Sequence, residues 1–587
     1  MYDAQISTIA ELEQEKLVGA QVAGVELVAL LNEEGVSVFE GHCPHQGTLL
    51  AEGHIENGRL VCRGHGWQFN SLNGVNVDDD QICLYRFPAV VENGKVLVDR
   101  AEIAAWGEKN KKMVKAGGKQ PLVIPEELPG PRGLPVLGNL HQIETRKFHL
   151  ILEDWQRQYG DVYQIALGAE RAVVIADPEM VQSILVERPD RFARLAGIRQ
   201  TIEEMGIEGL FSVEGEQWRR HRQLAKGAFD VRHLQDFFPI TRKVTQRLHR
   251  RWQQLAEQQI PLDAQRELMR YTVDITTNLA FGYDMNTLEE EGDRIQQHLE
   301  RIFPMIAFRA FMPVRYWNYL KLPADRALET SLAELRVSVN RFVEHARQQL
   351  ADTPILLERP QNLLQALLAA QGSEDIELSD SEIYGNVFTF LLAGEDTTAN
   401  SMAWMMYFMA KYPEVQRQMQ AEADSVLMDA ATVTEYEQIR ELRYIEAVAH
   451  ETMRFKPVAT FLALQALKDV TVDHLQIPEG TPLFLLLRPK GLEDTEFAEA
   501  AEFKPERWLN YSRQENPHHR ISFLPFGAGP RLCPGRSLAL HEIKMAVSMI
   551  CRHFDVVRTE PEQKIEERFI FTMMPVDLMV SLQPRDK

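Results

Sequence analysis

The sequence has few cysteines and no long apolar run. Five cysteines in 587 residues are too few for a disulfide framework, so the cysteines that stand in motifs are candidate metal ligands. No stretch approaches 18 consecutive apolar residues, and the N-terminus, MYDAQISTIAELEQEKL, has acids where a secretory signal would have basic and apolar residues. We therefore expect a cytoplasmic protein without a transmembrane anchor.

Positive charge is also scarce. The chain has 64 Lys and Arg against 85 Asp and Glu, a formal net charge of -21. This balance argues against nucleic acid as a partner and suits a basic protein partner or simple solubility. The sequence also lacks a fixed-period repeat, and no Gly-x-Gly-x-x-Gly follows a strand pattern, so we predict no flavin or NAD(P)H site in the chain itself.

One change in composition divides the chain. The segment GEKNKKMVKAGGKQPLVIPEELPGPRGLP, residues 107–135, combines lysines, a Gly-Gly pair and prolines without apolar periodicity. Before it, β-branched runs such as VELVALL and RLVCRG predict a small all-β domain over residues 1–105. After it, helical periodicity predicts a mostly α domain with minor β over residues 131–587. We expect residues 106–130 to be a linker with neither helix nor strand.

Two Cys-His pairs lie in the predicted β domain. The stretch CPHQGTLLAEGHIENGRLVCRGHGWQF contains Cys43 and His45, then Cys62 and His65, and the adjacent Pro and Gly residues predict tight loops that aim both pairs at one point. Ligands of these types hold zinc as readily as iron, so a structural zinc site is one alternative. Residues 1 to about 105 also resemble the Rieske family, whose [2Fe-2S] cluster has two Cys on one iron and two His on the other.

The Rieske resemblance implies a ligand for each position. Cys43 and Cys62 would be the thiolate ligands, and His45 and His65 the imidazole ligands. Position 46 is Gln and neither loop holds another Cys, so the loop-bridging disulfide of the respiratory Rieske proteins is absent. The segment is therefore more similar to the ferredoxins that serve bacterial oxygenases.

A single cysteine near the C-terminus lies in the segment FLPFGAGPRLCPGRSLAL. Cys533 precedes a helix predicted to begin near Gly535, and backbone N–H groups at a helix N-terminus favour a thiolate. The segment resembles the Phe-Gly-x-Gly-x-Arg-x-Cys-x-Gly signature of the cytochromes P450, the haem-thiolate monooxygenases, at every position. The matching residues are Phe526, Gly527, Gly529, Arg531, Cys533 and Gly535.

This resemblance implies that Cys533 is the proximal ligand of haem b. Arg531 would pair with a haem propionate, Phe526 would pack beside the sulfur, and Gly527 would be a further haem-binding residue. A buried structural thiol is the alternative for any lone cysteine, and it is our expectation for Cys83 and Cys551.

Further segments resemble the same family. ETMR and FKPERW match its buried Glu-Arg-Arg network, and WRRHR matches a Trp and an Arg that contact a haem propionate. Gln465 departs from the family, because many relatives have a basic propionate partner at that position. The residues implied are Glu451, Arg454 and Arg507 for the network, and Trp218 and Arg222 for the propionate.

AGEDTT, residues 393–398, lies within a long apolar helical pattern. Polar side chains in such a setting need partners. Asp396 and Thr397 resemble the acid-alcohol pair that delivers protons during oxygen activation, and Gly394 would leave room for oxygen over the haem. A threonine hydroxyl that bonds the preceding turn is compatible with this interpretation. The pair favours use of O2 over use of peroxide.

The two halves together predict a monooxygenase that inserts one atom of O2 into a substrate. Electrons would come from a separate flavin-dependent NAD(P)H reductase and pass through the Rieske cluster to the haem. The alternatives are an electron carrier or sensor without turnover, and a Rieske non-haem oxygenase, for which His518 and His519 lack the spacing of a facial triad.

The predicted pocket walls are strongly apolar and favour a lipophilic substrate. Arg309 or Arg315 could hold a substrate carboxylate, although a surface position is the expectation for both. The wall segments are residues 303–317, 388–394, 458–464 and 569–575.

Overall fold

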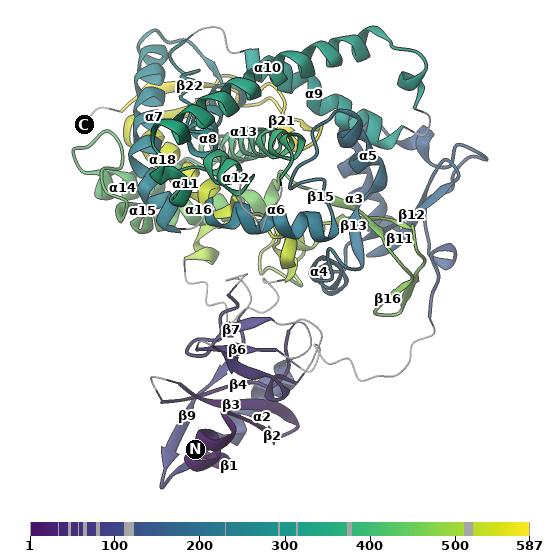
Figure 1. Ribbon diagram of the computed structural model, residues 1–587, viewed down its shortest axis with the longest axis vertical. Coiled ribbons are helices and arrows are strands. Elements are labelled where there is room, and N and C mark those ends of the chain that lie inside the picture. The colour runs from purple at the N-terminus through teal and green to yellow at the C-terminus, as the bar shows by residue number, and fades with distance from the viewer. Residues whose placement is uncertain are drawn as a thin grey trace.

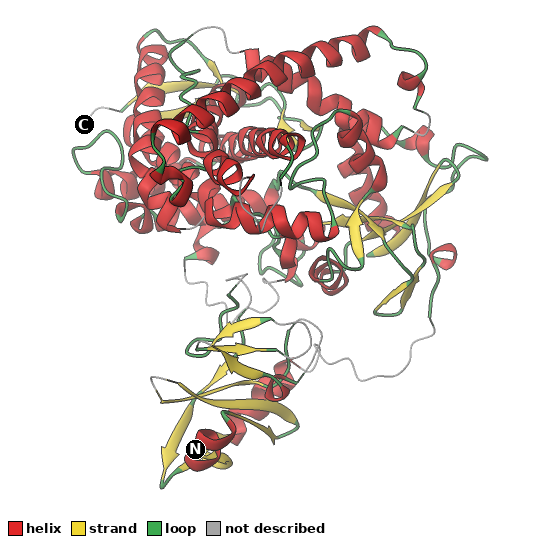
Figure 2. Cartoon of the chain, in the orientation of Figure 1, coloured by secondary structure: helices red, strands yellow, loops and turns green. Residues whose placement is uncertain are grey.

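The computed structural model separates a strand-rich N-terminal part from a helix-rich remainder, as Figure 2 shows. It describes residues 2–32, 35–44, 49–56, 58–62, 67–77, 83–110, 122–228, 231–290, 294–312, 315–371, 378–509 and 521–585. Within these ranges, no helix has the length and apolar character that crossing a bilayer requires. The cytoplasmic location stays a prediction.

The described residues of the N-terminal part form three antiparallel sheets, drawn in purple in Figure 1. Their strand orders are β2-β3-β4-β8, β1-β10-β9 and β5-β6-β7. The central strand β3 is buried along its middle because both faces of its sheet are covered. The strands are β1 (Tyr2–Thr8), β2 (Leu17–Val22), β3 (Val25–Asn32), β4 (Gly35–Glu40), β5 (His54–Glu56), β6 (Arg59–Val61), β7 (Gln68–Asn70), β8 (Arg86–Phe87), β9 (Ala89–Glu92) and β10 (Lys95–Asp99).

Two α-helices among the described residues accompany these sheets, α1 (Ile9–Glu15) and α2 (Arg100–Asn110). The second one corrects the prediction that the segment from residue 106 has no helix. Its Trp106 ring lies 5.4 Å from that of Tyr85 and 5.2 Å from that of Phe87, so burial of an indole on the domain core stabilises this end of the helix. Residues 111–121 of the predicted linker lie outside the described residues.

The second part begins where Val123 donates a backbone hydrogen bond to His474 O at 3.0 Å. Its main sheet has the order β11-β12-β18-β15-β13, with β12 and β18 parallel. Smaller sheets have the orders β14-β22-β19, β16-β17 and β20-β21. The strands are β11 (Val162–Leu167), β12 (Glu170–Ile175), β13 (Phe192–Arg194), β14 (Leu262–Asp263), β15 (Phe461–Ala466), β16 (Val470–Val472), β17 (Leu475–Ile477), β18 (Pro482–Leu486), β19 (Phe554–Arg558), β20 (Glu567–Phe569), β21 (Met573–Pro575) and β22 (Met579–Pro584).

Helices form most of the second part and surround the long helix α13 (Figure 1). They are α3 (Phe148–Tyr159), α4 (Pro178–Val186), α5 (Ala196–Glu204), α6 (Gly215–Ala228), α7 (Val231–Glu257), α8 (Ala264–Phe281), α9 (Arg294–Phe311), α10 (Pro323–Asp352), α11 (Ile355–Glu358), α12 (Leu363–Gln371), α13 (Asp380–Lys411), α14 (Pro413–Leu427), α15 (Gln438–Glu441), α16 (Arg443–Phe455) and α18 (Arg536–His553).

Helix α13 is capped at its start and packed tightly at its centre. Ser379 and Glu382 form a capping box, in which each side chain accepts a hydrogen bond from the other residue's backbone N–H. At the centre, a Cβ on Gly394 would lie 2.3 Å from Thr276 Oγ1 in α8. Glycine is therefore required at this position for the close approach of the two helices.

Candidate functional site

The loop around Cys533 is closed by backbone hydrogen bonds before α18 begins. Cys533 N donates to Phe526 O at 3.0 Å, and Gly527 N donates to Leu524 O at 3.0 Å. Gly527 has a φ of 76° and Gly529 a φ of 68°, which L side chains rarely adopt. The glycines of the signature thus set the path of the loop.

The surroundings of the Cys533 sulfur have opposing effects on its protonation. Burial raises the pKa of the thiol, whereas a backbone hydrogen bond from Gly535 and the charges of Arg222 and Arg536 lower it. Gly535 is also the residue that caps α18. The Gly535 N–H at the start of α18 and the charges of Arg222 in α6 and Arg536 in α18 thus all favour the thiolate of Cys533.

Arg531 extends from this loop to the segment before α6. Its guanidinium lies over the Trp218 ring, with Cζ 4.7 Å from the ring centroid. Its Nη2 donates to Val213 O at 2.6 Å and to the Glu214 carboxylate. Trp218 and Arg531, which were predicted separately from two motifs, are therefore neighbours.

Three more arginines, which the sequence analysis missed, belong to this cluster. The charge of Arg188 lowers the pKa values of both Arg194 and Arg531, and the charge of Arg199 lowers that of Arg531. Burial is the main cause of the lowering, and it brings the pKa of Arg531 to about 9 even though Glu214 opposes the shift. Several buried cations thus share one paired carboxylate, so an anion bound among them would be stabilised.

The arginine cluster has buried donors that lack acceptors, as expected of a site that binds a dicarboxylate. Arg188 is 4 % exposed, and its Nε and Nη2 have no hydrogen-bond partner within the described residues. Nε of Arg531 also has no hydrogen-bond partner within the described residues. Buried donors of this kind are costly unless an acceptor is supplied, and the two propionates of haem b are such acceptors. The residues present therefore fit the haem.

Gln465 is uncharged, so it supplies no cation at the position where many relatives have a basic propionate partner. Its Oε1 accepts a hydrogen bond from Ala196 N, the first residue of α5, at 3.1 Å. Strand pairing sets Ala193 opposite Gln465 and Arg194 opposite Leu464. Arg194 on β13 is thus paired with the residue that precedes Gln465 on β15.

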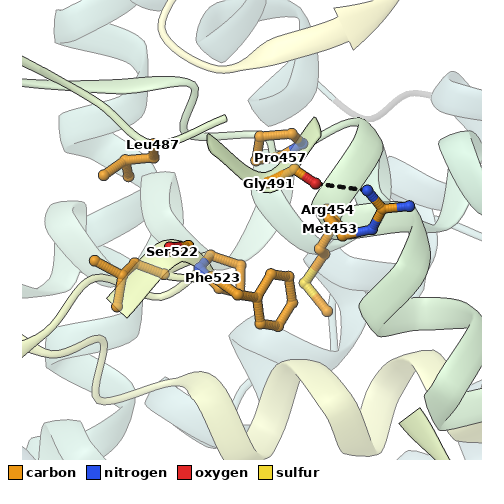
Figure 3. Close-up of a pocket in the computed structure, with 9 residues that line it drawn as sticks. Met453, Arg454, Pro457, Leu487, Gly491, Ser522 and Phe523 are labelled. Atoms are coloured by element: carbon orange, nitrogen blue, oxygen red, sulfur yellow. Dashed lines mark hydrogen bonds between the residues drawn. The ribbon is translucent and has the colours of Figure 1, made fainter. Parts of the chain in front are cut away.

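The predicted Glu-Arg-Arg network is present, buried and larger than its motifs indicate. Arg454 binds Glu451 through two hydrogen bonds and also donates to Gly491 O at 2.6 Å, a contact drawn in Figure 3. Arg507 Nε donates to Glu451 Oε1 at 3.2 Å. Trp508 Nε1 donates to Glu451 Oε2 at 2.8 Å, which the sequence did not predict.

This network lies beside the start of the Cys533 loop. Figure 3 shows Arg454 and Met453 of α16 across a small pocket from Phe523. Ser522 is part of the same lining. The network thus supports the chain just before the signature segment.

Asp396 is buried, 3 % exposed, and both carboxylate oxygens accept hydrogen bonds. Asn400 Nδ2 donates to Oδ1 at 2.7 Å, and the Thr572 hydroxyl donates to Oδ2. Burial raises the pKa of Asp396, and these two donors lower it. Asn400 follows Asp396 by one turn and could have been found by its i+4 spacing, whereas Thr572 comes from the distant β20-β21 hairpin.

Thr397 is only partly buried, and its hydroxyl donates to Ala393 O at 2.8 Å. This is the bond to the preceding turn that the sequence analysis considered. The Cβ-lacking side of Gly394 faces Thr276 of α8, so the structure gives this glycine a packing role. Room for oxygen at Gly394 stays a prediction.

Several of the predicted wall segments meet in an aromatic cluster. The Phe571 ring lies 5.5 Å from those of Phe211 and Phe303, and the Phe569 ring lies 4.9 Å from that of Phe461. These rings come from the hairpin, α9, β15 and the loop before α6.

The two arginines considered for a substrate carboxylate are already paired. Arg309 is buried, which corrects the expected surface position, and its Nη2 donates to Asp325 at 2.7 Å. Arg315 Nη1 donates to Glu204 at 2.5 Å. Neither arginine is an unpaired cation, so a substrate carboxylate would have to compete with an existing partner.

In the N-terminal part, Cys43 and Cys62 stand at the beginnings of two closed loops. Leu50 N donates to Gly41 O at 2.8 Å across the first loop, and Cys62 N donates to Trp67 O at 2.8 Å across the second. Both thiols are buried and belong to one apolar cluster, and none of the five cysteines forms a disulfide. The predicted ligands His45 and His65 lie outside the described residues.

The remaining cysteines are buried without a motif around them. Cys83 lies in the N-terminal part, where its thiol donates to Asn73 O at 3.2 Å. Burial raises the pKa of Cys551. Both are consistent with the expected structural role.

Comparison with known proteins identifies the class of both parts. The cytochrome P450 family model matches residues 128–582, and the Rieske [2Fe-2S] domain model matches residues 4–86. The chain belongs to the cytochrome P450 family and carries a Rieske domain at its N-terminus. It is therefore a P450 monooxygenase whose two domains imply haem and a [2Fe-2S] cluster.

The relatives among curated proteins include cytochromes P450 of animals. The putative cytochrome P450 CYP13A3 of Caenorhabditis elegans is 29% identical over 496 residues, which cover 78% of this chain and 93% of the relative. Cytochrome P450 3A29 of Sus scrofa is 28% identical over 442 residues, covering 73% and 85%. Cytochrome P450 3A25 of Mus musculus is 28% identical over 459 residues, covering 76% and 89%.

Proposed function

We propose that this chain is a monooxygenase for lipophilic substrates whose Rieske domain receives electrons from an external flavin-dependent NAD(P)H reductase and passes them to the haem. The overall reaction converts substrate, O2, NAD(P)H and a proton to hydroxylated substrate, water and NAD(P)+. The presence of both redox domains in one chain is the observation that carries the proposal. A Rieske cluster carries one electron at a time, so it would be used twice in each turnover.

Cys533 is the proposed haem ligand, and haem with thiolate ligation supplies the activation of O2. The Gly535 N–H and the charges of Arg222 and Arg536 favour the thiolate that this role needs. Arg188, Arg194 and Arg531 would hold the propionates. The Glu451 network would hold in place the segment that precedes the Cys533 loop.

Asp396 and Thr397 are the proposed route for protons. The buried carboxyl group of Asp396 would take protons from the solvent side and pass them toward the reacting oxygen, while the Thr397 hydroxyl orients water there. The raised pKa of Asp396 supports this role, because an acid that both gains and releases protons works best near the ambient pH.

The aromatic cluster supports a lipophilic substrate. Phe211, Phe303 and Phe571 would exclude water and provide apolar contact area. Because Arg309 is held by Asp325, a neutral substrate fits better than a carboxylic acid.

We further propose that the first domain ends with α2, since Trp106 is part of its packing. The electron path can then be tested by deleting residues 1–110. We expect turnover with NAD(P)H and a supplied reductase to collapse, while turnover with added peroxide persists because it needs no electron delivery. A truncated protein that accepts electrons as well as the intact chain does would overturn the path.

Spectra of the intact protein test the two metal sites separately. The reduced CO complex is expected to show the long-wavelength Soret band of thiolate ligation, and Cys533→His should move it to shorter wavelength. His65→Cys should retain a cluster with a lower potential and an unchanged haem content. Zinc in place of two irons per chain would establish a structural zinc site instead.

A further inference from the structure

The side chain of Thr572 contacts two residues of α13 at once. Its hydroxyl donates to Asp396 Oδ2 and lies 3.2 Å from Asn400 Nδ2, which donates to it. Asn400 Nδ2 also donates to Asp396 Oδ1 at 2.7 Å. The three side chains are at most 5 % exposed. They form a closed ring of hydrogen bonds away from water.

The amide of Asn400 has a fixed orientation in this ring. Its Oδ1 accepts a hydrogen bond from Gln265 Nε2 of α8 at 2.8 Å. Because the oxygen is engaged there, the NH2 group faces Asp396. Asn400 can therefore only donate to the carboxyl group.

Thr572 differs from Asn400 in this respect. A hydroxyl can donate to a carboxylate and can also accept from a carboxylic acid, so one side chain can bind Asp396 in both protonation states. Valine has the same shape and can do neither. The hydroxyl is thus the part of Thr572 on which the contact depends.

The hairpin that carries Thr572 also contributes to the aromatic cluster. Phe571, the preceding residue, packs against Phe211 and Phe303. At the start of the hairpin, Glu567 Oε2 accepts from Arg488 Nη1 at 2.8 Å and lies 3.0 Å from His149 Nε2. Two consecutive residues of an anchored hairpin therefore reach the apolar cluster and the buried acid.

We propose that Thr572 is a positioning residue that holds Asp396 in both of its protonation states and ties this acid to the β20-β21 hairpin. The inference rests on the proposed role of Asp396 in proton delivery. It goes beyond that role because it adds a second residue, 176 positions away in the sequence, that determines the orientation of the Asp396 carboxyl group.

The ionisable groups around the ring do not replace Thr572. Glu395 precedes Asp396 in α13, Glu542 of α18 accepts a hydrogen bond from Thr398, and Glu567 is engaged at the other end of the hairpin. Within the described residues, the side chains that hydrogen-bond to Asp396 are the uncharged Thr572 and Asn400.

Infrared titration of the intact haem-loaded protein tests the proposal. The carbonyl band of protonated Asp396 is assigned by its loss in Asp396→Asn, and its midpoint pH is compared among variants. We expect Thr572→Val to raise the midpoint, because the bond that the hydroxyl donates to the charged carboxylate is stronger than the bond that it accepts from the neutral acid. Thr572→Ser should leave the midpoint near that of the wild type. Equal midpoints in the wild type and Thr572→Val would overturn the proposal.

Thr460→Val is the matched control. Thr460 is 1 % exposed, and its hydroxyl has no partner in the described part of the chain, so this variant removes a buried hydroxyl without removing a contact to the acid. Its midpoint should match that of the wild type. If Thr572→Val fails to fold, Thr572→Ala removes the same hydroxyl with a smaller side chain and carries the same expectation.

Turnover provides a second readout. With NAD(P)H and a supplied reductase, Thr572→Val should show a larger solvent deuterium isotope effect on O2 consumption than the wild type, and Thr572→Ser should restore the wild-type value. A shifted midpoint combined with normal turnover in Asp396→Asn would contradict the proton-delivery role of Asp396 while leaving its positioning by Thr572 intact.

Discussion

Arg454 donates to both carboxylate oxygens of Glu451, at 2.9 and 2.7 Å, from one turn further along α16, and both side chains are completely buried. Three more bonds, to the backbone oxygens of Gly491, Ala500 and Glu502, use the rest of the guanidinium. One side chain thus fixes a helix and the long segment that leads toward the Cys533 loop. The planar fork of arginine suits this role, because it donates in several fixed directions at once.

Arg454→Lys should therefore be strongly destabilising even though the charge is kept. Lysine cannot reproduce the paired bonds, and breaking a buried ion pair costs about 3–5 kcal/mol. Chemical denaturation measures the loss in the free energy of unfolding. Arg157→Lys is the control, because Arg157 forms an exposed pair with Asp154 and should change the free energy by less than about 1 kcal/mol. Similar losses in both variants would contradict the prediction.

Glu567 should make the stability of the protein depend on pH in the acid range. Although burial raises the pKa of this carboxyl group, bonds and charges from His149, Arg488 and Lys456 hold it below its usual range. The carboxylate therefore contributes stability above the unfolded-state pKa of about 4.3, and this contribution is lost as the pH falls below that value.

Glu567→Gln should be less stable than the wild type at neutral pH by about 3 kcal/mol, and the difference should shrink as the pH falls below about 4. Unfolding curves recorded at several pH values measure this difference. Glu566→Gln is the control, because the neighbouring Glu566 side chain is 65% exposed. A constant difference between Glu567→Gln and the wild type at all pH values would exclude the proposed linkage.

Arg188→Leu should weaken haem retention without destabilising the apoprotein. The buried guanidinium has two unpartnered donors within the described residues, and burial lowers its pKa despite the charge of Glu214, so its removal from the apoprotein relieves a desolvation cost. In the haem-bound protein it would cost a charge-assisted hydrogen bond, about a 10- to 100-fold change in affinity. Haem transfer to apomyoglobin measures the rate of loss. Arg171→Ala, at the exposed end of β12, should not change it.

Thr397→Ala should preserve haem binding and divert electrons to peroxide. The hydroxyl that would order water near the reacting oxygen is removed, and product formation should fall by about 10²-fold, the usual effect of a lost proton-transfer group. Product and peroxide formed per NAD(P)H are the measured quantities, and Thr397→Ser is the matched control. Unchanged coupling in the alanine variant would show that Thr397 has no part in proton delivery.

Local motifs allowed the class of both domains to be predicted, and the comparisons confirm the fusion. The signature around Cys533 and the i, i+3 pair of Glu451 and Arg454 can be recognised because their residues are close in the sequence. Arg188 and Thr572 could not be predicted. Arg188 lies near Glu214 and Arg531, and Thr572 contacts Asp396, and these neighbours come from segments of the sequence that only the fold brings close.

The boundary between the domains was also difficult to predict, and for a different reason. Lysines and glycines after residue 106 suppress apolar periodicity, so the sequence favours a linker from that point. A single indole, that of Trp106, packs on Tyr85 and Phe87, and α2 continues to Asn110. One large ring outweighs weak local propensity, which is the usual result when tertiary packing and intrinsic preference disagree.

The position of Trp106 has a consequence for how the enzyme would respond to dilution. Helix α2 ends at Asn110, and Val123 N donates a hydrogen bond to His474 O, so the chain between residues 110 and 123 can span at most about 45 Å. Because this connection is short, the Rieske domain as electron donor would meet the haem domain at an effective concentration on the order of millimolar, whatever the concentration of enzyme in solution. The step between cluster and haem should then be first order in the enzyme, and only the encounter with the reductase should slow as the protein becomes scarce.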